Sequence, residues 1–135
     1  MNKYTNFIGG EWIAAKSGET FQNVNPADTR ETVAEYAASS AEDAVAAIDA
    51  ASAAFVQWSG MTPVARGRVL SKAAEILAPR KAELTELLTR EEGKTLFESG
   101  LEVGRAIDIF RFFGGNSYTI GGQTFPHDMP NILMY

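Results

Sequence analysis

The stretch SAEDAVAAIDAASAAFVQW, residues 40–58, marks the point where the sequence changes from a strand-like to a helical pattern. Ser40 is a favourable N-cap residue, and Asp43 stands three residues later, as in a capping box. After this pair, apolar residues recur on one helical face: Val45, Ile48, Ala51, Phe55 and Trp58. The pattern predicts a helix from residue 40 and places the strands of the chain before it.

Short extended segments precede this helix. Gly9-Gly10 separates residues 6–8 from residues 11–14, and two glycines suit the positive φ angles of a tight hairpin turn. Residues 20–24 predict another strand, which Asn25-Pro26 stops because proline lacks a backbone N–H and restricts the residue before it. Residues 32–37 return to a period of two and predict a further extended segment.

Two helices are predicted next. Thr62-Pro63 opens the second helix with a capping residue and a proline in the first turn. Its apolar set is Val69, Leu70, Ala73, Ile76 and Leu77. Pro79 divides it from a third helix, which should end at Gly93 and which carries Leu84, Leu87 and Leu88.

A fourth helix is predicted from about Thr95 to Phe113, where Gly114-Gly115 should break it. Its expected buried stripe is Leu101, Ile107, Phe110 and Phe113, and Phe112 is a candidate interface residue. Residues 118–126 predict an extended segment, and residues 131–135 begin another strand-like run whose apolar end needs a partner.

Composition excludes several classes of function. The net charge of −5 is spread over interspersed acids and bases, so no basic stripe is available for a nucleic acid partner. The chain contains no cysteine, which removes disulfides, thiolate metal sites and a cysteine nucleophile. No run of 18 apolar residues predicts a membrane span. A cytoplasmic protein is therefore expected.

Four further groups of residues are typical of ordinary helix ends, surfaces and turns rather than of a functional site. Residues 91–94, Glu-Glu-Gly-Lys, are typical of a charged helix end with a glycine cap. Arg66 and Arg68 stand two residues apart and should point to different sides of a helix, which does not suit a phosphate site. His127, the only histidine, is expected on a surface loop. The glycine pairs follow a helix and lack phosphate-loop spacing.

Five short motifs, in this order, resemble the amino-terminal region of aldehyde dehydrogenases. They are FIGGEW at residues 7–12, VNPA at 24–27, EGKT at 92–95, FRFFGG at 110–115 and GGQTFP at 121–126. Each motif alone is common, but together they cover nearly the whole chain. The pattern looks most similar to the branch that oxidises semialdehydes, such as the succinate and 2-oxoglutarate semialdehyde enzymes.

The resemblance implies an α/β fold in the context of an intact enzyme. Residues 1–117 are expected to form an incomplete amino-terminal part of the cofactor-binding domain: β-hairpins followed by four helices. Residues 118–135 are expected to begin a segment that bridges subunits, so the intact enzyme should be a homodimer or homotetramer.

The resemblance also implies oxidation of an aldehyde to a carboxylic acid with NAD or NADP. Such enzymes use a cysteine nucleophile, a glutamate base and oxyanion donors, all located downstream of the matched region. No catalytic or cofactor-binding residue is therefore assigned to this chain, which should be inactive by itself. The substrate, the choice of NAD or NADP and the oligomer size depend on residues outside it.

The resemblance also implies one metal-ion site that falls within this chain. Many members hold a structural monovalent cation with backbone carbonyls before the Asn-Pro pair and an acid on the fourth helix. The motif places Asn23 and Val24 at the carbonyls and Glu102 at the acid, where aspartate is commoner. A salt-bridged or solvated Glu102 is the alternative. For the chain as a whole, the alternative to part of an enzyme is a small self-folding α+β interaction module.

Overall fold

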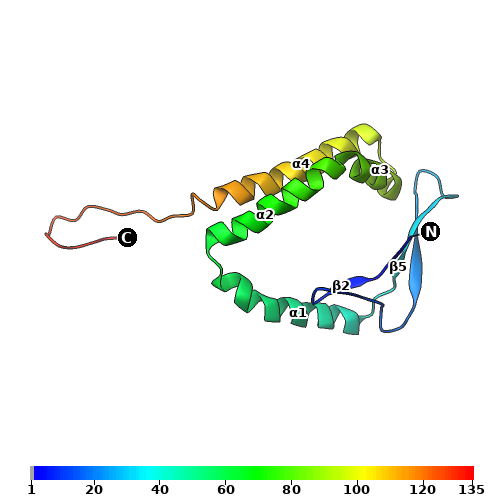
Figure 1. The fold of residues 1–135 in the computed structure, drawn as a ribbon, viewed down its shortest axis with the longest axis horizontal. Coiled ribbons are helices and arrows are strands. Elements are labelled where there is room, and N and C mark those ends of the chain that lie inside the picture. The colour runs from blue at the N-terminus through cyan, green and yellow to red at the C-terminus, as the bar shows by residue number, and fades with distance from the viewer. Residues whose placement is uncertain (1) are drawn as a thin grey trace.

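The computed structural model describes residues 2–135 as an α/β arrangement with a protruding carboxyl-terminal arm (Figure 1). Strands β1 (Lys3–Tyr4), β5 (Thr32–Ala37) and β4 (Thr20–Val24) form a sheet in that order, parallel between β1 and β5 and antiparallel between β5 and β4. Strands β2 (Asn6–Ile8) and β3 (Glu11–Ile13) form a separate hairpin. The strands predicted within residues 6–37 are confirmed, whereas β1 was not predicted.

Glycines in the hairpin turn and pairs of aromatic side chains stabilise these strands. Gly9 and Gly10 have φ angles of 63° and 90°, the left-handed backbone that a tight hairpin turn requires. Across this hairpin the rings of Phe7 and Trp12 lie 5.0 Å apart. In the other sheet, Tyr36 on β5 stacks between residues of both neighbouring strands, which joins three strands through one aromatic side chain.

Helix α1 (Ala41–Gly60) begins as the sequence predicts. The Ser40 hydroxyl and the Asp43 carboxylate form a capping box, and the buried Asp43 also accepts a hydrogen bond of 3.0 Å from the backbone N–H of Lys16. The cap therefore holds the start of α1 against the loop after β3. The predicted apolar face exists but is not buried by the described residues, since Val45, Ile48 and Phe55 are 56%, 66% and 63% exposed.

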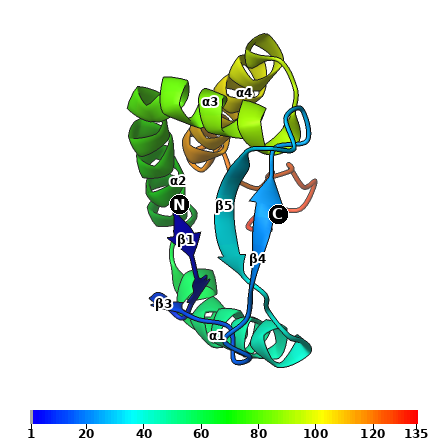
Figure 2. The same ribbon diagram turned by 90° about the vertical axis from the view of Figure 1, so that its right-hand side faces the viewer.

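Helices α2 (Pro63–Leu77), α3 (Lys81–Glu92) and α4 (Leu96–Asn116) form the other half of the molecule, as Figures 1 and 2 show. Thr62 caps α2, as expected, and Thr95, the predicted start of the fourth helix, caps α4. The predicted division at Pro79 is a single 3-10 turn, η1 (Ala78–Arg80). Gly93 ends α3 with φ 72°, which confirms the predicted glycine cap.

The predicted break of the fourth helix at Gly114-Gly115 is wrong. Helix α4 continues to Asn116 because Gly114 lies against α2, where a Cβ atom would stand 3.1 Å from the carbonyl oxygen of Gly67. A Cβ atom on Gly67 would in turn stand 2.6 Å from the carbonyl oxygen of Gly114. The two glycines thus serve the close approach of two helices.

The buried core beside this contact is small. Ala74 of α2 packs with Val103 and Ile107 of α4, and partly buried side chains surround them: Leu77, Ala78, Leu84, Leu88 and Phe110. Ile107 and Phe110 were predicted correctly. The prediction was wrong for Leu101 and Phe113, which are exposed because they lie on sides of α4 that no described element covers.

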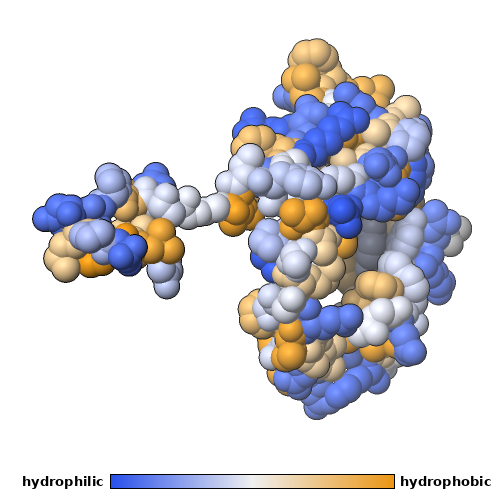
Figure 3. Space-filling model, turned by 60° about the vertical axis from the view of Figure 1, so that its left-hand side comes forward, coloured by the Kyte–Doolittle hydropathy of each residue, from blue (hydrophilic) through white to orange (hydrophobic). Residues whose placement is uncertain are grey.

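Residues 118–135 form an arm that extends away from the helices (Figures 1 and 3). Every residue of the arm is exposed, and Phe125 and Met134 form a single antiparallel bridge near its end. Helix α4 ends at Asn116, next to the predicted division after residue 117, while the roles assigned to the two parts stay predictions. None of the described helices is long and apolar enough to span a membrane.

We expect Gly67→Ala to lower the free energy of unfolding by about 1–3 kcal/mol, because its methyl group would collide with α4 backbone and force the helices apart. Gly115→Ala is the matched control, since open space surrounds that position and alanine favours a helix by about 1 kcal/mol. Urea denaturation of the full chain measures both. Equal effects of the two substitutions would contradict this account of the contact.

Candidate functional site

A polar network joins the β-sheet to the helices at the turn between β4 and β5. The Asn25 side chain is buried and donates a hydrogen bond of 2.7 Å to the Glu31 carboxylate, while its oxygen accepts from the backbone N–H of Ala27. Arg90, near the end of α3, binds the other oxygen of Glu31 at 2.6 Å. Glu31 therefore ties the Asn-Pro turn to α3.

Two more contacts strengthen the same junction. The Asn23 side-chain amide on β4 donates to Glu91 of α3 over 3.2 Å. At Gly93 the chain passes so close to the turn that an added Cβ atom would lie 2.9 Å from the ring of Pro26. The Asn-Pro and Glu-Gly-Lys motifs, far apart in the sequence, thus lie against each other.

Lys94 occupies the loop between α3 and α4. Its ammonium contacts the carboxylate of Glu92 and lies 2.7 Å from a carboxylate oxygen of Glu102. These carboxylates, Glu102 first and Glu92 second, raise the pKa of Lys94. The predicted glycine cap is present, and the lysine beside it is only 19% exposed, so it is not a freely solvated side chain.

The residues of the predicted cation site occupy two sides of this junction. Asn23 and Val24 end β4, which is an edge strand with a register shift between these two residues. Glu102 is on α4 and binds Lys94. The Glu102–Lys94 ion pair matches the salt-bridged alternative, and the cation site itself stays a prediction.

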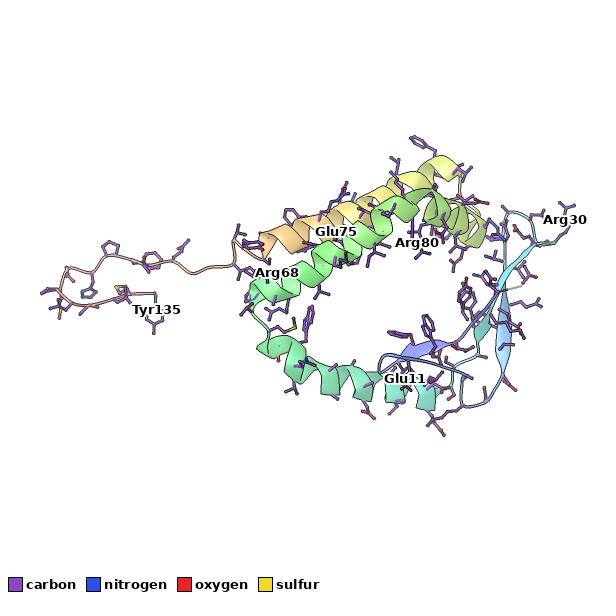
Figure 4. All side chains as sticks on the ribbon, in the orientation of Figure 1. Glu11, Arg30, Arg68, Glu75, Arg80 and Tyr135 are labelled. Atoms are coloured by element: carbon purple, nitrogen blue, oxygen red, sulfur yellow. The ribbon has the colours of Figure 1, made fainter. Side chains whose placement is uncertain are left out.

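The other sequence motifs take no part in the junction. Arg66 donates to the carbonyl oxygen of Met61 at 2.6 Å, whereas Arg68, labelled on α2 in Figure 4, is exposed. That the two point to different sides of the helix stays a prediction. His127 lies on the exposed arm and accepts from the backbone N–H of Met129. Within residues 2–135, no group of three or more histidine, aspartate or glutamate side chains could hold a metal ion.

Sequence reasoning missed the Glu31–Arg90 pair and the apolar groove beside it. The groove, about 230 Å³, lies between α3 and α4 and is lined by Leu84, Leu88, Val103 and Ile107. The Asn25-Pro26 turn was a signal that a polar side chain is needed there, but nothing in the sequence pairs residue 31 with residue 90. Such a pairing depends on tertiary structure.

Taken together, these features define part of an α/β protein whose sheet edge, helices and arm leave much apolar surface uncovered. The model of the aldehyde dehydrogenase family matches residues 12–135. The chain belongs to this family.

The relatives add detail. An alpha-ketoglutarate semialdehyde dehydrogenase of Haloferax volcanii is 45% identical over 96% of the chain, and one of Bacillus subtilis is 38% identical over 100%. The crystal structure of an NAD-dependent aldehyde dehydrogenase from Sinorhizobium meliloti matches 98% of the chain with a TM-score of 0.87 and 28% identity. The chain spans 27%, 28% and 27% of the length of these three proteins.

We expect Glu31→Gln to lower the free energy of unfolding at neutral pH. We also expect this free energy to fall less steeply as the pH is lowered into the acid range. Hydrogen bonds from Asn25 and then Arg90 lower the pKa of Glu31. This contribution is complete above the ordinary value of 4.5 and is lost as the pH falls through the lower value of the folded chain.

Urea denaturation between about pH 7 and pH 3 measures this effect. Glu86→Gln is the matched control, because Glu86 is an exposed carboxylate on α3 that lies outside the network. Identical pH profiles for Glu31→Gln and the unaltered chain would contradict the role of Glu31.

Proposed function

We propose that this chain is the amino-terminal part of an NAD(P)-dependent dehydrogenase that oxidises a semialdehyde to a carboxylic acid, with 2-oxoglutarate semialdehyde as the first candidate. The family match and the names of the two similar semialdehyde dehydrogenases support this proposal. The share of those proteins that the chain spans supports the idea that further residues complete the enzyme.

The observation that carries the proposal is the uncovered apolar surface. Large apolar side chains are exposed along α1 and α4, among them Val45, Ile48, Phe55, Phe97, Leu101 and Phe112, and Figure 3 shows apolar side chains spread over the face in view. Patches of this extent normally meet another part of a protein. A self-folding interaction module would cover the outward sides of its helices with polar residues instead.

The chemistry of the reaction must come from residues beyond this chain. Aldehyde oxidation of this kind needs a thiolate nucleophile, and the chain has no cysteine. The glycines do not fit a phosphate-binding loop either, because Gly114 is used in the contact between α2 and α4. The nicotinamide cofactor, which supplies the hydride acceptor, is therefore held elsewhere.

The residues present would contribute a frame. Caps, the α2–α4 contact and the Glu31–Arg90 pair hold the sheet edge and helices in fixed positions, while the uncovered faces of α1 and α4 receive the cofactor-binding sheet. Positioning of this kind matters because catalytic groups must stay within fractions of an ångström of their working geometry. A cytoplasmic location stays a prediction.

The arm is proposed to bridge subunits of a homodimer or homotetramer. It extends away from the helices and exposes apolar side chains, including Ile120, Phe125, Ile132 and Met134. An exposed extended segment of this composition favours pairing with another strand.

We expect the polypeptide of family length that begins with this chain to reduce NAD or NADP in the presence of 2-oxoglutarate semialdehyde. The absorbance of the reduced cofactor measures turnover, with succinate and malonate semialdehydes compared at equal concentration. Residues 1–135 alone are expected to give no turnover. Absence of turnover with all three aldehydes in the folded long polypeptide would contradict the proposed function.

We expect Phe125→Asp to shift the long polypeptide toward smaller assemblies, because a charge would enter the apolar strand of the arm. Gln123→Asp, at an exposed polar position of the same arm, is the control and should leave the assembly unchanged. Light scattering after size-exclusion chromatography measures the mass. An unchanged mass for Phe125→Asp would contradict the proposal that the arm forms the interface between subunits.

A further inference from the structure

We draw no further inference here: the strongest candidate, the groove of about 630 Å³ that Lys81 and Arg105 line along α4 and the start of α3, belongs to the uncovered surface already described, and nothing in the structure shows which group covers it.

Discussion

The close approach of α2 and α4 is the constraint on which the helical half of the molecule depends. Gly67 and Gly114 leave no room for a side chain where the two helices meet, and this distance sets how Ala74 reaches Val103 and Ile107. Close backbone packing gains van der Waals contact that larger residues would prevent. The absence of a Cβ atom at these positions therefore lets the two helices that carry the small core approach closely.

Polar contacts, rather than apolar ones, connect this helical half to the strands. Glu31 receives hydrogen bonds from Asn25 and Arg90, and Lys94 holds the ends of α3 and α4 together a few residues away. Charged groups that are partly shielded from water interact more strongly than groups on an open surface. The junction therefore brings the Asn-Pro motif and the Glu-Gly-Lys motif into one structural unit. Its polar contacts suit a structural role rather than a catalytic one.

The uncovered apolar surfaces indicate that further elements pack against the helices of this chain. Helix α1 is capped at its start by buried Asp43 and yet presents most of its apolar face to solvent. The same is true of Leu101 and Phe113 on α4, whose burial was predicted from periodicity. Periodicity shows that a face will be covered, and it does not show whether the covering element lies within the same 135 residues.

The sequence by itself determined the elements and the family. Local chemistry is sufficient for the Gly9-Gly10 turn, the Ser40 and Thr95 caps and the Gly93 helix end, because each involves neighbours along the chain. Tertiary structure alone decided that Gly114 continues a helix instead of ending it, that Glu31 pairs with Arg90, and that Lys94 reaches Glu102. These outcomes depend on contacts between distant segments, whose distances and partners no local pattern specifies.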